Sequence, residues 1–341
     1  MSERLEDIAA AMVTAGKGIL AADESSGTIK KRFDSINAES TEDNRRDYRE
    51  MLFRSTEAME NHISGVILFD ETLRQKAADG TPLVDIIKAT GAVPGIKVDG
   101  GAKALAGHPG ETVTEGLDGL RDRLNEYHGL GARFAKWRGV IAIADDLPSG
   151  ASVRANAHAL ARYAALCQEA GIVPIVEPEI QMDGSPGNHS IDRCYDVSEW
   201  VLRTVFAELY DARVNLEGIV LKPNMVIDGS NARKASVDEV AEKTVRCLRA
   251  TVPASVPGIA FLSGGQNDEE ATAHLSAMNA AYDLPWKLTF SYGRALQAAC
   301  LKAWGGKPEN VAAGQRAFAH RARMNGLAAT GNWNSDLEKA A

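Results

Sequence analysis

Short apolar runs recur along the chain, and longer amphipathic segments separate them. The runs are uninterrupted rather than alternating, which is typical of parallel strands buried on both faces. They predict strands at residues 18–22, 64–69, 95–98, 133–143, 172–179, 219–222, 258–262 and 286–290. Apolar residues at helical spacing predict helices at about 3–15, 41–60, 115–129, 152–170, 192–211, 236–251, 268–282, 294–304 and 308–325.

The alternation of strands and helices predicts an α/β fold in which helices cover a parallel sheet. At 341 residues, one closed (β/α)8 TIM barrel fits this pattern better than an open doubly wound sheet. A dinucleotide-binding sheet would carry Gly-x-Gly-x-x-Gly after its first strand, and this sequence does not. No linker, repeat or low-complexity segment divides the chain. We therefore expect a single barrel domain over 1–325, with an extra N-terminal helix and a final C-terminal helix, followed by a mobile tail at 326–341.

Composition narrows the class of protein. The chain is 45% hydrophobic and 25% charged with a formal net charge of −8, so we expect no broadly basic surface for nucleic acid or for a membrane. The four cysteines lie far apart in the sequence, which favours reduced thiols over disulfides. The charged N-terminus is unlike a secretory signal, and no apolar run reaches the roughly 18 residues of a membrane span. These features predict a soluble, cytoplasmic protein.

Charged and hydroxyl side chains occur where the predicted strands end. In (β/α)8 barrels the carboxyl ends of the strands form the site, so these side chains would meet in one cavity. Lys136 and Arg138 are two positions apart and share a strand face, as do Glu177 and Glu179. A single strand-end carboxylate is usually a helix cap, but unpaired polar groups on so many buried strands would be costly. The pattern favours a functional cluster made from Asp23, Lys97, Lys136, Arg138, Glu177, Glu179, Lys222, Ser263, Ser291 and Arg294.

Lys222 ends an apolar run and is followed at once by Pro223. Proline cannot donate to a sheet ladder and restricts the preceding residue to an extended backbone, which fixes where the lysine points. Cations near an amine in a partly dry pocket lower its proton affinity, and a neutral amine can attack a carbonyl to form a Schiff base. Carboxylates would then remove water and move protons. This set suits aldol chemistry without a metal or another cofactor. The dispersed histidines lack the cluster that a metal-dependent aldolase needs.

Two groups of residues predict anion sites. Ser-Gly-Gly at 263–265 and Ser-Tyr-Gly-Arg at 291–294 would offer backbone N–H groups, hydroxyls and a guanidinium at the usual phosphate site of this fold. A second site would follow the first strand, although a solvated helix turn explains its basic residues equally well. Its candidates are Ser25, Thr28, Lys31 and Arg32, with Lys97 nearby.

Several motifs resemble class I fructose-1,6-bisphosphate aldolases, in order, from about residue 3 to 325. They are GILAADES at 18–25, GIKVD at 95–99, FAKWR at 134–138, VEPEI at 176–180, LKPNMV at 221–226, LSGGQ at 262–266 and LTFSYGRALQ at 288–297. The resemblance implies a (β/α)8 barrel that reversibly cleaves fructose 1,6-bisphosphate to dihydroxyacetone phosphate and glyceraldehyde 3-phosphate, in glycolysis and gluconeogenesis. It also implies a homotetramer.

The resemblance assigns a role to each matching residue. Lys222 would form the Schiff base, Glu177 would act as the general acid/base for imine formation, and Asp23 would take the C4-hydroxyl proton. Lys136 would be an essential neighbouring cation, with Glu179, Arg138 and Lys97 in the same cluster. The C1 phosphate would bind Ser263, Gly264, Gly293 and Arg294. The C6 side would use Ser25, Thr28, Lys31, Arg32 and Lys97.

Two departures from the animal pattern affect these expectations. Animal members end in a tyrosine that assists proton transfer, whereas this chain has no tyrosine after Tyr292. We expect slower or differently routed protonation. Gly100 and Gly101 stand where the animal pattern has a lysine, which would weaken the distal phosphate site. The alternatives are a Schiff-base aldolase for a related substrate such as sedoheptulose 1,7-bisphosphate, and a barrel that serves as a binding scaffold.

Overall fold

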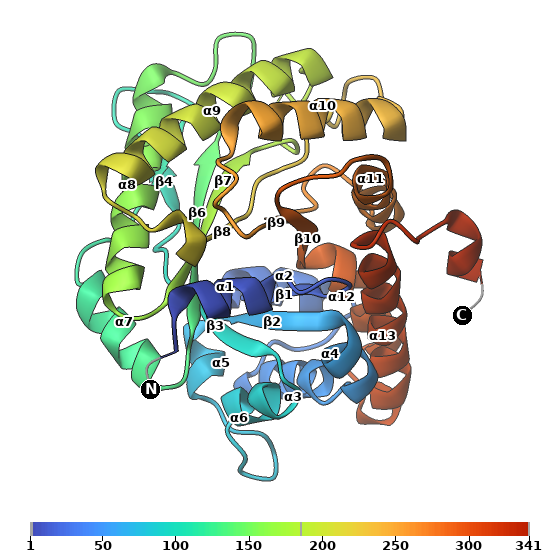
Figure 1. The fold of residues 1–341 in the computed structure, drawn as a ribbon. Coiled ribbons are helices and arrows are strands. Elements are labelled where there is room, and N and C mark those ends of the chain that lie inside the picture. The colour runs from blue at the N-terminus through green and yellow to red at the C-terminus, as the bar shows by residue number, and fades with distance from the viewer. Residues whose placement is uncertain (1–2, 185, 340–341) are drawn as a thin grey trace.

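The computed structural model describes residues 3–184 and 186–339, and within them eight parallel strands close into a barrel. The predicted (β/α)8 fold is confirmed (Figure 1). Around the barrel the strand order is β1-β10-β9-β8-β7-β6-β3-β2. The strands are β1 (Gly18–Ala22), β2 (Ile63–Leu68), β3 (Val93–Lys97), β6 (Phe134–Ile141), β7 (Val173–Ile180), β8 (Val220–Leu221), β9 (Gly258–Phe261) and β10 (Lys287–Tyr292).

Helices surround the barrel as the sequence predicts (Figure 1). Serine or asparagine N-caps fix where several of them begin: the side chains of Ser149, Ser190, Ser236 and Asn267 each accept a backbone N–H of the first turn. The predicted helices correspond to α1 (Leu5–Met12), α3 (Glu42–Phe53), α4 (Thr56–His62), α7 (Leu120–Gly129), α8 (Gly150–Glu169), α9 (Ile191–Asp211), α10 (Val237–Thr251), α11 (Asp268–Ala281), α12 (Arg294–Trp304) and α13 (Val311–Ala328).

The extra N-terminal helix has a structural role, because α1 closes one end of the barrel. Its apolar face packs on the interior side chains of the strands, and in Figure 1 it lies across the middle of the barrel. These interior residues form a cluster separate from the larger core between strands and helices. The cluster consists of Ile8, Ala9, Met12, Val13, Ile19, Ala21, Ile67, Phe134, Val173, Ile175, Val220 and Ala260.

The structure also contains elements that the pattern does not predict. These are α2 (Ser26–Asp34), α5 (Asp70–Arg74), α6 (Leu83–Ala89), an antiparallel hairpin of β4 (Ala102–Ala104) and β5 (Thr112–Thr114), and three 3-10 helices at Leu216–Gly218, Pro308–Asn310 and Ser335–Lys339. Helix α2 buries only Ile29 and Phe33, so its apolar stripe is too narrow to be recognised. The single helix expected at 41–60 is two helices, α3 and α4, separated at Arg54 and Ser55.

The C-terminal segment differs from the expected boundary at 326, since α13 continues to Ala328. Beyond it, Glu338 accepts hydrogen bonds from Arg321 at 2.6 and 2.7 Å and from the Trp333 indole at 3.0 Å. The His320 ring lies 3.0 Å from the same carboxylate. These contacts place residues 335–339 against α13, although the mobility of the tail stays a prediction.

Glycine in the middle of β3 makes room for an aromatic ring of the barrel interior. A Cβ atom at Gly95 would overlap the ring of Phe134, its neighbour on β6. We expect Gly95→Ala to lower the free energy of unfolding by about 2 kcal/mol, because an overpacked core must shift backbone or force a rotamer. Chemical denaturation measures this difference. Gly129→Ala is the matched control, since a Cβ there meets no atom within 4 Å. Equal stability of Gly95→Ala and wild type would contradict this account of the barrel interior.

Candidate active site

A cavity of about 330 Å³ opens at the carboxyl ends of the barrel strands. It brings together most of the residues that the sequence predicts for a site, and they come from six strand ends and from α2. Its lining is Ala21, Arg32, Lys136, Arg138, Glu177, Glu179, Asp183, Lys222, Leu262, Ser263, Gly264, Ser291, Gly293 and Arg294.

Lys222 is buried and held between two neighbouring strands. Its backbone N–H donates to the carbonyl of Val176 on β7 at 2.8 Å, while the carbonyl of Pro223 accepts the N–H of Leu262 at 3.1 Å. Proline therefore keeps its one hydrogen-bonding group paired and fixes the extended backbone on which the lysine stands. The ammonium nitrogen lies 3.1 Å from Oε1 of Glu177.

Glu177 lies between two lysines. Its Oε2 is 3.5 Å from Nζ of Lys136, whose other partner is Oδ2 of Asp23 at 2.9 Å. Sequence reasoning expects cations around Lys222, and the structure adds that the ion-pair partner of Lys222 is this carboxylate. The four side chains form one buried charge cluster from β1, β6, β7 and β8.

The mutual attraction within the cluster shifts the pKa values of Asp23 and Lys136 towards their charged forms. Burial opposes ionisation of Asp23, but the charges of Lys136 and Lys222 outweigh it and lower the pKa of Asp23 to about 2. Burial likewise disfavours the Lys136 ammonium, and the carboxylates of Asp23 and Glu177 overcome this and raise its pKa. Asp23 is therefore ionised and Lys136 protonated at neutral pH.

A further ion pair, less buried than the cluster, lines the same cavity. Arg138 and Glu179 face each other in a bidentate pair, with Nη2 2.8 Å from Oε1 and Nε bonded to Oε2. Burial acts against the guanidinium charge, but Glu179 more than compensates and raises the pKa of Arg138. Such fork geometry fixes both side chains. In this structure Glu179 orients Arg138 rather than contacting Lys222.

The residues predicted to bind phosphate lie at the ends of the seventh and eighth barrel strands, β9 and β10. Ser263, Gly264, Gly293 and Arg294 all line the cavity. The hydroxyl of Ser291 is fully buried and has no hydrogen-bond partner within the described residues, so it is a free group facing the cavity. Arg294 donates to the backbone carbonyl of Gln266 at 2.9 Å. This arrangement provides donors for an anion.

The residues expected on the C6 side are not gathered in the same way. Of that group, Arg32 lines the cavity, whereas Thr28 and Lys31 are exposed on α2. The hydroxyls of Ser25 and Thr28 lie 3.2 Å apart. Lys97 turns to Asp99, with its Nζ 3.0 Å from Oδ1. These four residues are near the first and third strand ends but outside the cavity lining.

Sequence reasoning missed two acidic residues of this region. Asp183 follows β7 and lines the cavity. Glu24 is buried next to Asp23 and forms an ion pair with Arg32, with Oε1 2.6 Å from Nη1. Glu24 lies in the quoted stretch 18–25, so two successive carboxylates after an apolar strand are the signal that could have revealed it.

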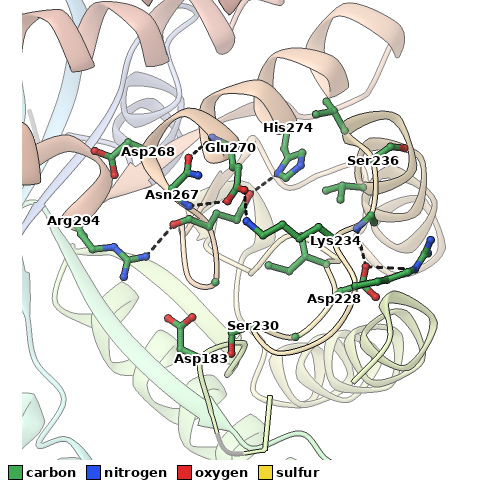
Figure 2. A pocket seen from close by; sticks show the side chains of 18 of the residues that line it. Asp183, Asp228, Ser230, Lys234, Ser236, Asn267, Asp268, Glu270, His274 and Arg294 are labelled. Carbon is green, nitrogen blue, oxygen red and sulfur yellow. Dashed lines mark hydrogen bonds and ion pairs between the residues drawn. The ribbon is translucent and has the colours of Figure 1, made fainter. Parts of the chain in front are cut away.

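A larger pocket of about 630 Å³ adjoins the cavity and shares Asp183 and Arg294 with it (Figure 2). Between α10 and α11, Lys234 forms an ion pair with Glu270 at 2.5 Å. The His274 ring lies 2.6 Å from Oε1 of Gln266. Burial lowers the pKa of His274 to about 4, so the ring is neutral at physiological pH.

Within residues 3–184 and 186–339, no group of three or more histidine, cysteine, aspartate or glutamate side chains is arranged to hold a metal ion. No helix of the described chain is long and apolar enough to span a membrane. The cysteines are buried and unpaired.

A closed barrel with a cluster of paired charges at its carboxyl strand ends defines a (β/α)8-barrel enzyme. The family model for fructose-bisphosphate aldolase class-I matches residues 4–341. The chain is 58% identical over 333 residues to a probable fructose-bisphosphate aldolase class 1 of Xanthomonas axonopodis pv. citri, covering 97% of this chain and 98% of that one. The chain belongs to the class I fructose-bisphosphate aldolase family.

Further similarities agree with this. A cytosolic fructose-bisphosphate aldolase 6 of Arabidopsis thaliana is 55% identical over 331 residues, covering 97% of this chain and 91% of that one. The solved fructose-bisphosphate aldolase of Plasmodium falciparum, in complex with TRAP and a small-molecule inhibitor, superposes with a TM-score of 0.93 at 48% identity. That match covers 97% of this chain and 95% of the other. The family and the fold expected from the sequence are both confirmed.

Replacing Lys136, which pairs with both Asp23 and Glu177, should lower the free energy of unfolding. Lys136→Met leaves Asp23 and Glu177 undercompensated, and we expect a loss of about 3 kcal/mol in unfolding free energy at pH 7. In wild type the lowered pKa of Asp23 stabilises the fold above the ordinary value of 3.8 and this contribution is lost as pH falls towards 2. In the variant the carboxylates bind protons more tightly in the folded state, so the deficit shrinks between pH 7 and 4. Denaturant titrations at several pH values measure it, and a deficit independent of pH would contradict the charge cluster.

Proposed function

We propose that this chain reversibly cleaves fructose 1,6-bisphosphate to dihydroxyacetone phosphate and glyceraldehyde 3-phosphate through an imine on Lys222, in glycolysis and gluconeogenesis. The observation that carries the proposal is the carboxylate of Glu177 in contact with both Lys222 and Lys136, with Asp23 as the second partner of Lys136. The family and its named relatives support this substrate over the seven-carbon bisphosphate considered above.

The first step forms the imine. The amine of Lys222, once deprotonated, attacks the C2 carbonyl of the open-chain sugar, and a carbinolamine results. Glu177 is within hydrogen-bond reach of the lysine nitrogen, so it can donate a proton to the departing hydroxyl and later recover one. Water leaves, and the nitrogen becomes a protonated imine. The neighbouring Lys136 ammonium would stabilise the carboxylate each time Glu177 gives up its proton.

The second step breaks the C3–C4 bond. Asp23 accepts the proton of the C4 hydroxyl, the C4 carbonyl forms, and the bonding electron pair moves into the protonated imine to give an enamine. Glyceraldehyde 3-phosphate then departs. Lys136 holds the Asp23 carboxylate in its ionised form and in place, since the two groups are 2.9 Å apart.

The last step returns a proton to C3 of the enamine, and water then releases dihydroxyacetone phosphate from Lys222. Animal relatives use a terminal tyrosine for this proton transfer, and this chain has no tyrosine after Tyr292. The terminal residues 340–341 lie outside the described residues.

The phosphate assignments follow the cavity. The C1 phosphate would accept hydrogen bonds from the hydroxyls of Ser263 and Ser291, from the backbone of Gly264 and Gly293, and from Arg294, all of which line the cavity. The distal phosphate would use residues near the first and third strand ends: Ser25, Thr28, Lys31 and Lys97. Those four side chains lie beside the cavity rather than in its lining.

We also propose a cytoplasmic location and a homotetramer. Relatives named as cytosolic isozymes support the location. The tetramer rests on the family resemblance stated above. A phosphorylated sugar is the partner that the site fits, and we expect the reaction to need no metal.

Borohydride reduction tests the imine directly. In the presence of dihydroxyacetone phosphate, reduction should attach the triose covalently to wild type and abolish activity, because the reduced imine cannot hydrolyse. Lys222→Met should not be labelled and should lose activity by at least about a thousandfold. Peptide mass spectrometry locates the label.

Lys287→Met is the matched control, because this exposed lysine stands at the opposite end of β10. It should be labelled at Lys222 as wild type is. Label on Lys222→Met would overturn the assignment of the nucleophile. Activity abolished by EDTA and restored by a divalent cation would overturn the metal-independent route.

A further inference from the structure

Glu24 is a buried carboxylate that the proposed mechanism does not use. It directly follows Asp23 after β1 and is 6% exposed. A carboxylate is rarely buried unless charged or hydrogen-bonding partners surround it. Its partners therefore indicate what it does.

One oxygen of Glu24 is held by an ion pair and by a hydrogen bond. Oε1 lies 2.6 Å from Nη1 of Arg32 and accepts a hydrogen bond from Nε2 of Gln297 at 3.0 Å. Gln297 is itself immobilised, since the same Nε2 donates to the carbonyl of Ala21 at 2.7 Å and its Oε1 accepts from the Tyr48 hydroxyl at 3.0 Å. The position of the carboxylate is thus set by the barrel and α12, before any ligand binds.

The other oxygen faces a buried guanidinium. Oε2 of Glu24 lies 3.9 Å from Nη2 of Arg49, which donates instead to the backbone carbonyl of Glu24 at 2.8 Å. Arg49 is 1% exposed. The charge of Glu24 is therefore balanced from both sides, and Arg32 is the partner that reaches the cavity.

Arg32 connects the fixed carboxylate of Glu24 to the cavity. Its Nη2 would lie 3.4 Å from a Cβ atom at Gly293, so the guanidinium sits over the backbone of that glycine. Gly293 is also the N-cap of α12, and the first turn of that helix contains Arg294 as well as Gln297. One helical turn thus connects two of the three arginines that line the cavity, Arg294 by sequence and Arg32 through Gln297 and Glu24.

We propose that Glu24 is a positioning residue that holds Arg32 beside Gly293, so that the phosphate next to the reacting ketone meets two guanidinium groups. The family resemblance grouped Arg32 with the distal phosphate, whereas its place beside Gly293 puts it at the C1 end. This inference rests on the proposed aldolase function. Planar guanidinium groups bind phosphate through a fixed fork of N–H donors. The ion pair with Glu24 holds that fork in place.

Steady-state kinetics with two substrates tests the role. Fructose 1,6-bisphosphate carries both phosphates, and fructose 1-phosphate carries only the one next to the ketone. We expect Glu24→Gln to raise KM about tenfold for both substrates while kcat stays within about twofold, because the lost interaction orients a binding group and does not touch the reacting atoms. Glu24→Asp retains the charge and should lie between wild type and Glu24→Gln, and it serves as the second variant if Glu24→Gln is unstable.

Two further variants separate positioning from general loosening. Glu24→Gln should add nothing to Arg32→Gln in the double variant, because both remove the same contact. Glu169→Gln is the control, since Glu169 is bound by Arg121 through a bidentate pair outside the cavity and has no contact with the Glu24 network. It should leave KM unchanged even if it lowers the melting temperature.

An unchanged KM in Glu24→Gln, the same further loss in the Arg32→Gln background, or a rise confined to the bisphosphate would each overturn the inference. Failure of the aldolase proposal is distinguishable from these results, because wild type itself would then cleave neither substrate.

Discussion

A single carboxylate shared by two buried lysines is the constraint on which the site depends. Glu177 contacts Lys222 at 3.1 Å and Lys136 at 3.5 Å, and Lys136 in turn contacts Asp23. Desolvating such charges costs several kcal/mol per ion, and their mutual attraction offsets this only when the geometry is good. A hydrophobic replacement would give a more conventional barrel core. The cluster is therefore best explained by the proposed chemistry, in which Lys222 would bond to carbon and the carboxyl groups of Glu177 and Asp23 would transfer protons.

The barrel supplies that geometry through its register. Pairing of β6 with β7 sets Arg138 beside Glu177 and Val140 beside Glu179, and Lys222 continues β8 by bonding to β7. Lys136, Glu177 and Lys222 consequently lie on three consecutive strands, β6, β7 and β8, whereas Asp23 follows β1, which pairs with β10 and β2. The proposed phosphate donors come from the ends of β9 and β10 and from the start of α12.

Much of this could be predicted from sequence, for identifiable reasons. Uninterrupted apolar strands specify a parallel sheet, and residues two apart such as Lys136 and Arg138 must leave the same face. What the sequence does not specify is which cation meets which carboxylate, because that depends on rotamers set by neighbouring strands. Glu179 accordingly pairs with Arg138 rather than with a lysine.

Other features depend on contacts between distant segments. The role of Glu24 could not be predicted from the sequence, because its partners Gln297 and Arg49 reach it only through tertiary packing. The narrow apolar stripe of α2 likewise conceals a helix that the rest of the fold stabilises.

The most direct measurement is a crystal structure of the chain soaked with fructose 1,6-bisphosphate and frozen during turnover. The account predicts continuous electron density from Nζ of Lys222 to C2 of the sugar, with Glu177 beside the new bond. One phosphate should lie against Ser263, Gly264 and Arg294, with Arg32 close to it. Density for an intact sugar that is not joined to Lys222, or an imine on Lys136, would contradict the central claim.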